Sequence, residues 1–355
     1  DAPTYDEVVA AAAAGSGDDD FHVLHRMDGD GDSARHRLLS GAALTDDELP
    51  SLFAALRPGL RYKQLASLGG RAVNEHDYVE MFQNGRPVCV EADEFQWAAR
   101  CTPKGKAPGA SGITADAVAV MPLAWHEMAA EVLNLISKTQ LTPEQWRVGL
   151  TSYVHKGGAC RALGNFRPIM LLDVLMKIAM RVHVSRMTKA WRRMGVLTDT
   201  NAGFQKARGT ASSIFPLRVA AAQAMRRKED VAALFDDVAW AFDTPPRAVI
   251  ELALHRLGVP GYFIRMLRDV DNMALRDTLL AGGPASNTSQ RYHRVLFGTA
   301  QGSVEGPSLW MAVADIVVDW AAMNADSPVT LDGGPHGSVK VSSATFVDDS
   351  GLIQS

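Results

Sequence analysis

The sequence predicts an α+β protein in which helices surround a small sheet. Long segments with apolar residues at helical spacing are separated by a few short apolar segments typical of strands, and no internal repeat is present. The chain has 355 residues, 47% hydrophobic and 21% charged, which is typical of a globular protein with two or three domains or subdomains.

The composition argues against a membrane protein and against a disulfide scaffold. No run of about 18 apolar residues is present, because Asp315 and Asp319 interrupt the best candidate, Leu309–Met323. The three cysteines are far apart and form no CxxC pattern. Since no signal peptide is seen either, we expect an intracellular protein without a membrane partner.

Helices are expected where apolar residues recur every three or four positions. The segment from Tyr5 contains an alanine run, the segment from Glu91 ends at a loop rich in Gly and Pro, and the segment from Leu171 has basic edges. In chain order they are Tyr5–Ala14, Leu49–Leu68, Tyr78–Phe82, Glu91–Arg100, Met121–Ile136, Leu171–Met194, Ser212–Lys228, Pro246–Leu257 and Leu309–Met323.

Strands are expected in three further segments. Val148–His155 is followed by Lys-Gly-Gly, which predicts a hairpin turn. Val231–Val238 is apolar and then acidic, and Val339–Ile353 predicts a pair of strands around Asp348 and Asp349.

The two late strand segments end in carboxylates, which are hard oxygen ligands suited to Mg²⁺. Leu234–Asp243 reads LFDDVAWAFD, and Ala344–Ile353 reads ATFVDDSGLI. A surface turn is the plainer interpretation of an Asp-Asp pair. Here the pair Asp348 and Asp349 lies within an apolar, β-branched stretch, which favours a metal site.

Charge is distributed unevenly along the chain. The net charge is −9 over residues 1–50, +11 over 141–230 and −6 over 231–355. A basic middle followed by an acidic end suits a nucleic-acid groove beside a metal-binding carboxylate cluster. Solvated helix faces explain the same charges, so both interpretations stay open at this point.

Six motifs occur in order between residues 106 and 349. They read KAPGASGI from Lys106, NFRPIMLL from Asn165 with Lys177 and Arg181 after it, NAGFQKARGT from Asn201, DVAWAFD from Asp237, GTAQGSVEGPSL from Gly298 and FVDD from Phe346. As an ordered set they resemble the reverse transcriptases of non-LTR retrotransposons. Five residues depart from the family's usual ones at their positions: Ser111, Asn201, Asp236, Trp240 and Gly306.

The resemblance implies a two-metal catalytic site. Asp237, Asp348 and the carbonyl of Val238 would hold two Mg²⁺ ions, with Mn²⁺ as a possible substitute, and Asp349 would be a secondary catalytic carboxylate. Asp236 directly precedes the motif. Phe242, five residues after Asp237, fixes the register and selects Asp237 as the ligand.

The resemblance also implies nucleotide contacts. Lys156 and Arg167 would clamp the triphosphate, since a point charge and a guanidinium fork neutralise phosphate charge. Phe242 would lie under the sugar and exclude a 2′-hydroxyl, and Gln301 and Gly302 would face the base pair. A solvated lysine, a core phenylalanine and an ordinary turn are the plainer alternatives for Lys156, Phe242 and the Gln-Gly pair.

Basic residues of the middle region are candidates for template–primer phosphate contacts. We predict such contacts for Arg181, Lys189, Lys206 and Arg208, and Arg186, Arg192 and Arg193 are further candidates. The glycine-rich loop at 105–112 lacks the GK[ST] ending of a P-loop, so a nucleotide cradle of that kind is not expected.

The resemblance implies the fingers and palm of a right-hand polymerase, with an antiparallel palm sheet backed by helices. We expect residues 1–90 to be an acidic N-terminal extension that is partly disordered at its start, 91–229 the fingers and the start of the palm, and 230–355 the rest of a truncated palm. The chain reads as a fragment without a thumb. By itself it is expected to be inactive.

The implied function is RNA-directed DNA synthesis. Deoxynucleoside triphosphates would be added to the 3′-hydroxyl of a DNA primer on an RNA template, and a nuclear location would fit the family. Two alternatives stay open: an inactive RNA-binding remnant of a retroelement, and a metal-dependent phosphohydrolase that uses the same aspartates.

Overall fold

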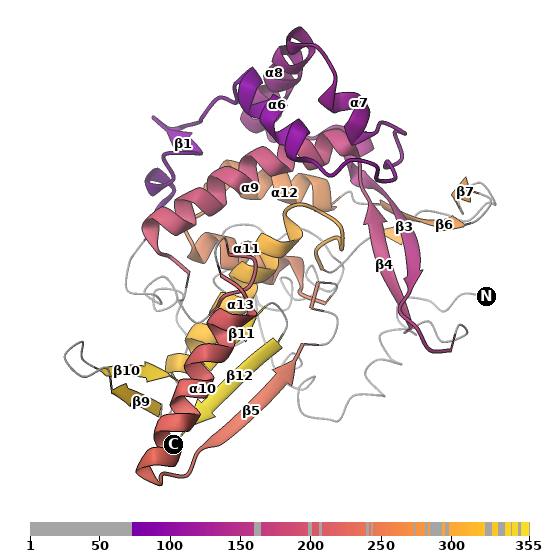
Figure 1. Cartoon of the computed structure of the whole chain (residues 1–355). Coiled ribbons are helices and arrows are strands. Elements are labelled where there is room, and N and C mark those ends of the chain that lie inside the picture. The colour runs from indigo at the N-terminus through magenta and orange to yellow at the C-terminus, as the bar shows by residue number, and fades with distance from the viewer. Residues whose placement is uncertain are drawn as a thin grey trace, which may run out of the picture.

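The computed structural model describes residues 73–159, 165–197, 201–205, 208–238, 241–242, 244–272, 275–280, 283–284, 293–294, 298–323, 329–332, 338–341, 343–346 and 349–354. The expected helices Tyr5–Ala14 and Leu49–Leu68 lie outside these residues. Within them, helices and small, mainly antiparallel sheets are combined, which confirms the α+β prediction (Figure 1).

The helix expected at Tyr78–Phe82 is wrong. A single turn forms there, after the short 3-10 helix η2 (Glu75–Asp77), and the chain then enters the hairpin β1 (Phe82–Gln83) and β2 (Arg86–Pro87). Asn84 and Gly85 connect the two strands with φ values of 50° and 72°. Both residues tolerate this left-handed conformation, which is typical of a two-residue hairpin turn and ends any helix.

Four helices follow, and the first of them, α6 (Ala92–Cys101), packs against the other three, which include α8 (Leu123–Thr139) and α9 (Val174–Met194). The short α7 (Ala115–Ala119) begins at Thr114, whose side chain accepts a hydrogen bond from the Ala117 N–H. The helices expected at 91–100 and 121–136 are confirmed with small shifts of their ends. α9 is mostly buried and ends at Gly195, which has φ +61°.

The helix expected from Leu171 begins later, because Leu171 still belongs to a strand. β3 (Val148–His155) has the expected bounds and pairs antiparallel with β4 (Phe166–Leu171), so that Leu150 lies opposite Leu171. Asp173 then caps α9 by accepting hydrogen bonds from the N–H groups of Leu175 and Met176.

β3 is extended into a mixed sheet by strands that the sequence did not predict. It pairs in parallel with β6 (Leu275–Leu280), which also pairs antiparallel with β7 (Gly283–Pro284) and β8 (His293–Arg294). Pairing between segments so distant in the chain leaves no local sequence signal.

A second sheet has the order β11-β12-β5 and is antiparallel throughout. Its strands are β5 (Ala232–Asp237), β11 (Ser343–Phe346) and β12 (Asp349–Gln354), which confirms the strands expected around the aspartates. The helices α10 (Thr210–Arg227) and α13 (Gly306–Met323) contact β11, and α10 also contacts a small hairpin of β9 (Val329–Asp332) and β10 (Ser338–Val341) (Figure 1).

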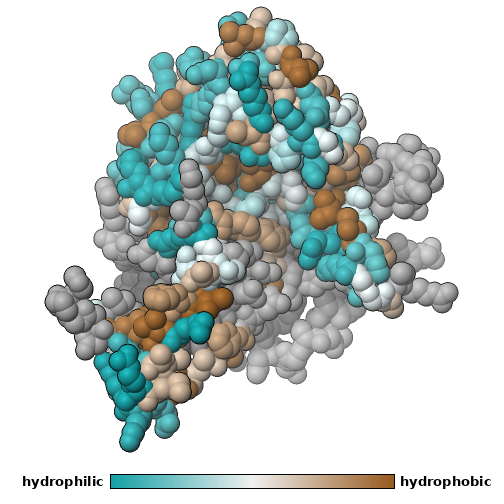
Figure 2. Space-filling view, viewed as in Figure 1, coloured by the Kyte–Doolittle hydropathy of each residue, from teal (hydrophilic) through white to brown (hydrophobic). Residues whose placement is uncertain are grey.

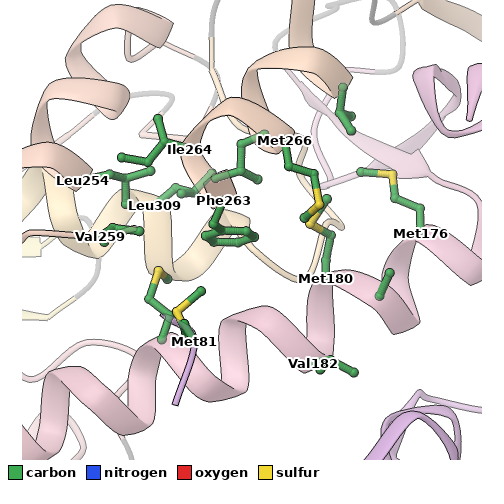
Figure 3. Close-up of a cluster of buried hydrophobic side chains, with 14 of the residues drawn as sticks. Met81, Met176, Met180, Val182, Leu254, Val259, Phe263, Ile264, Met266 and Leu309 are labelled. Atoms are coloured by element: carbon green, nitrogen blue, oxygen red, sulfur yellow. The ribbon is translucent and has the colours of Figure 1, made fainter. Parts of the chain in front are cut away.

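The hydrophobic core lies where α9 meets the later helices. α11 (Arg247–Arg256) and α12 (Gly261–Asn272) contribute side chains such as Leu254, Phe263 and Met266, which lie near Met180 of α9 and Leu309 of α13 (Figure 3). α12 was not predicted from the sequence. The core thus joins helices from early and late parts of the chain.

The surface is largely hydrophilic over the region of α6 and α9 and more hydrophobic beside α10 (Figure 2). The last turn of α10 is basic, with Arg226 and Arg227. Among the helices that the structure describes, none has the length and apolar character needed to cross a bilayer.

Candidate active site

The two strands that carry the predicted aspartates are adjacent in the structure. β12 pairs with β5 so that Asp349 lies directly opposite Asp237, and Ser350 lies opposite Asp236. Asp348 lies outside the described residues, but it directly precedes Asp349 in the chain. The fold thus joins two carboxylate motifs from distant parts of the sequence at one sheet position.

The donor types at this position fit Mg²⁺. Carboxylate and backbone carbonyl oxygens are the hard ligands that this ion takes, and Val238 follows Asp237 at the end of β5. Within the part of the chain that the structure describes, no group of three or more His, Cys, Asp or Glu residues forms a metal cluster. The metal roles of Asp237, Val238, Asp348 and Asp349 stay predictions.

The segment after Asp237 is tied to the loop that contains Gln301. The carbonyl of Phe242 accepts hydrogen bonds from the Thr299 N–H at 2.7 Å and from the Thr299 hydroxyl at 3.3 Å. The Gly298 N–H donates to the carbonyl of Pro245 at 2.8 Å. The fourth and fifth motifs of the sequence are therefore neighbours, and Thr299 is a residue of this junction that sequence reasoning missed.

The same loop is also tied to β4. The Met170 N–H donates to the carbonyl of Gln301 at 2.7 Å. Gly302 has φ +113°, and a Cβ built there would lie 2.7 Å from the carbonyl oxygen of Met170, so only glycine fits this close approach. The Gln301 side-chain oxygen is buried and has no hydrogen-bond partner among the described residues.

Phe242 is half-buried and has two aromatic neighbours. Its ring centroid lies 6.1 Å from that of Phe204, at an interplanar angle of 70°, and 6.3 Å from that of Trp310. Phe204 comes from the third motif and Trp310 from α13. Sequence reasoning did not single out either neighbour, because nothing in the linear order indicates the contact.

Lys156 and Arg167 lie on the β3–β4 hairpin and are both exposed. The backbone N–H of Lys156 donates to the backbone carbonyl of Asn165, and Arg167 of β4 lies opposite Val154 of β3. Gly157 and Gly158 have φ values of 110° and 83°, which confirms the expected turn after β3. The hairpin is joined to the site through β4, where the Met170 N–H donates to the carbonyl of Gln301.

The predicted nucleic-acid contacts have different surroundings. Lys189 and Arg208 are exposed, and Lys206 lies outside the described residues. Arg181 is half-buried, and this burial lowers the pKa of its guanidinium. Its Nε has no hydrogen-bond partner among the described residues.

Arg186 and Arg193, two further candidates, have structural partners. The Arg186 guanidinium is buried, pairs with Glu94, and donates to the carbonyls of Val88 and Cys89. Arg193 pairs with Glu80 at 3.0 Å. For Arg186 the phosphate-contact interpretation is wrong, because every one of these donors points into the protein.

The first motif packs against the start of α9. A Cβ at Gly109 would lie 2.5 Å from the backbone carbon of Leu172, so the loop needs glycine to approach the main chain. Burial lowers the pKa of the half-buried Lys177, one turn further along, although Glu305 and Asp173 act in the opposite direction. Glycine at this position therefore serves the packing of the first motif against the start of α9.

Comparison with known proteins defines the class of proteins to which the chain is similar: RNA-directed DNA polymerases of transposable elements from Drosophila melanogaster. This similarity confirms the resemblance to non-LTR reverse transcriptases that the ordered motifs predicted. No protein-family model matches the chain.

Three particular relatives carry this similarity. The RNA-directed DNA polymerase from mobile element jockey is 24% identical over 281 residues, which cover 78% of this chain and 29% of the relative. The probable RNA-directed DNA polymerase from transposon X-element is 27% identical over 206 residues, covering 58% and 22%. The corresponding protein from transposon BS is 28% identical over 159 residues, covering 44% and 17%. The matched part is thus less than a third of each relative's length.

Proposed function

We propose that this chain is the polymerising region of a reverse transcriptase, which copies an RNA template into DNA by extending a primer with deoxynucleotides. The observation that carries the proposal is the register of β5 and β12, in which Asp237 lies opposite Asp349. The similarity to RNA-directed DNA polymerases supports the same conclusion from an independent direction.

In this proposal the helices α6 to α9 and the β3–β4 hairpin form the fingers. The sheet β11-β12-β5 with α10, α11 and α13 forms the palm. The boundary expected from the sequence, between 91–229 and 230–355, falls between α10 and β5, so in this proposal α10 is the start of the palm within the first part.

The residues that would hold the metal ions are Asp237, Asp348 and the carbonyl of Val238, with Asp349 beside them on β12. Bound Mg²⁺, or Mn²⁺ in its place, would supply the positive charge that activates the primer hydroxyl and stabilises the leaving pyrophosphate. The aspartates keep that charge at the sheet position where the primer end and the nucleotide would meet.

The other site residues would bind and orient the nucleotide. Lys156 and Arg167 would neutralise the triphosphate, and exposure on the hairpin leaves both accessible to solvent. Phe242 would lie against the sugar and exclude a 2′-hydroxyl. Gln301 and Gly302 would face the base pair, and the missing Cβ of Gly302 keeps the loop close to β4.

Arg181, Lys189, Lys206 and Arg208 are proposed to contact the phosphates of the template and primer. Such contacts supply affinity without base specificity, and they weaken as salt rises.

The test is primer extension on an RNA template by the complete polypeptide that contains this chain, with Mg²⁺ or Mn²⁺. Asp237→Ala should reduce extension below detection. Asp236→Ala, one position earlier in β5 and opposite Ser350, is the matched control and should retain extension. If Asp236→Ala loses activity and Asp237→Ala retains it, the metal ligand has been assigned to the wrong aspartate.

The same assay separates the alternatives. A wild-type protein that binds an RNA–DNA hybrid but extends no primer would favour an inactive RNA-binding remnant. Release of phosphate or nucleotide without extension would favour the phosphohydrolase. Either outcome would contradict the proposed polymerase.

A further inference from the structure

Phe204 lies outside the predicted site, but its side chain contacts the ring of Phe242, a residue of that site. Its ring lies edge-on to Phe242, with centroids 6.1 Å apart and planes at 70°. Edge-to-face pairs of this kind have a preferred geometry beyond simple area burial, because the positive edge of one ring meets the negative face of the other. The contact therefore constrains where the Phe242 ring lies.

The conformation of Phe204 is set by its turn. Its φ of +52° lies in the left-handed region, which bulky residues rarely adopt. The buried Asn201 holds this turn: its side-chain oxygen accepts from the Gly203 N–H at 3.3 Å, and its carbonyl accepts from the Gln205 amide at 2.5 Å. Such a conformation persists only where the surroundings fix it, and it clusters at functional sites.

Core packing does not explain Phe204. The residue is 46% exposed, in contrast to the buried aromatic residues of the core. It also lines a cavity of about 210 Å³ that is bordered by Trp191, Arg192 and Met311. Phe204 thus contacts Phe242 and borders open space, and loss of its ring would give the Phe242 ring room to move.

The main chain at Phe242 is fixed separately. Both hydrogen bonds from Thr299 hold the Phe242 carbonyl, so its backbone does not depend on Phe204. The ring position, in contrast, depends on its aromatic neighbours, Phe204 and Trp310.

We infer that Phe204 is a positioning residue that sets sugar selectivity by holding the ring of Phe242 in place. This inference rests on the proposed function, in which Phe242 excludes the 2′-hydroxyl. A ring that stays in place discriminates against ribonucleotides, and a ring that can withdraw admits them.

The experiment measures kcat/KM for single-nucleotide addition with a deoxynucleotide and with the matching ribonucleotide, using the complete polypeptide. Phe204→Ala should lower the selectivity ratio roughly 3- to 10-fold, mainly through faster ribonucleotide addition. Phe204→Tyr keeps the ring and should keep the ratio within about 2-fold. Phe215→Ala, at an exposed phenylalanine of α10, is the matched control and should leave the ratio unchanged.

A double mutant tests whether Phe204 acts through Phe242. In a Phe242→Ala background, Phe204→Ala should have no further effect on the ratio, whereas two independent effects would multiply. Phe204→Leu provides a second variant if the alanine variant does not fold, and it should give an intermediate ratio.

The outcomes separate this inference from the proposed function. If the wild type extends primers and Phe204→Ala leaves the ratio unchanged, the inference is wrong and the polymerase proposal stands. Multiplicative effects in the double mutant would also contradict it. If the wild type adds no nucleotide at all, the proposed function is wrong and this inference with it.

Discussion

The basic side chains of α9 and those of the β3–β4 hairpin look alike in the sequence but lie in different surroundings. On α9, the Arg186 side chain is 10% exposed and bonded to Glu94 and two backbone carbonyls. On the hairpin, Lys156 and Arg167 are exposed. The charge of α9 is thus partly used to join α9 to the preceding segment, whereas the hairpin presents its charge to solvent. A count of basic residues therefore overestimates the surface available to nucleic acid.

The largest effect on stability among these variants is expected from breaking the buried ion pair between Arg186 and Glu94. Arg186→Ala leaves Glu94 and two carbonyls without their partner, so the free energy of unfolding should fall by about 3 kcal/mol. Urea denaturation measures this change. Arg193→Ala, on the same helix but with an ion pair that is 45% exposed on the arginine side, should cost less than about 1 kcal/mol. Equal losses in the two variants would mean that burial does not distinguish them.

On the β3–β4 hairpin, loss of a basic side chain is expected to reduce activity and to leave stability nearly unchanged. Arg167→Ala should leave the unfolding free energy within about 0.5 kcal/mol of wild type and reduce kcat/KM for nucleotide addition about 100-fold. Arg167→Lys should recover only part of the loss, because lysine keeps the charge but not the guanidinium fork. A stable protein with undiminished kcat/KM would remove Arg167 from the nucleotide site.

A third expectation concerns how stability depends on pH through His183, on the buried face of α9. His183 is fully buried, and its ring nitrogens lie 3.4 Å from the Ser137 and Tyr262 hydroxyl oxygens. Burial first, and then the charge of Arg186, lower the pKa of His183 to about 3. The unfolded chain binds a proton near pH 6.5 and the folded chain does not, so stability is lost as pH falls below 6.5.

The expected loss is about 2 kcal/mol between pH 7 and pH 5. Urea denaturation at these two values measures it. His183→Gln should show a smaller loss over the same interval. His126, whose pKa burial also lowers, is unchanged in that variant and keeps part of the dependence. An identical pH dependence in wild type and variant would contradict the assignment to His183.

The sequence predicted elements with a strong local pattern and missed those that depend on distant partners. β3 has the expected bounds because alternation and the following Gly-Gly turn define it. The start of α9 was placed too early, because β3 pairs with Leu171 and keeps it in a strand. β6 went unpredicted because its pairing with β3 joins distant segments.

The site shows the same division. The ordered motifs predicted which strands carry the aspartates, and the strands are indeed paired. The contacts of Thr299 and Phe204 with Phe242 could not be predicted, since they arise only when three separate segments fold together. The roles of the predicted site residues stay predictions until the variants are measured.

The smallest effect sharpens the comparison within α9 itself. Lys189 and Arg193 are both exposed on this helix, but the Arg193 guanidinium is bound to Glu80. If Lys189 contacts a phosphate of the template–primer, Lys189→Ala should lower the slope of log K against log salt by about 0.9 and weaken binding modestly. Arg193→Ala should leave the slope unchanged, because its charge is already engaged within the protein. Titration of an RNA–DNA hybrid between about 50 and 200 mM salt measures both slopes. A slope that changes in Arg193→Ala and not in Lys189→Ala would reverse the assignment, and it would mean that the ion pair with Glu80 opens when nucleic acid binds.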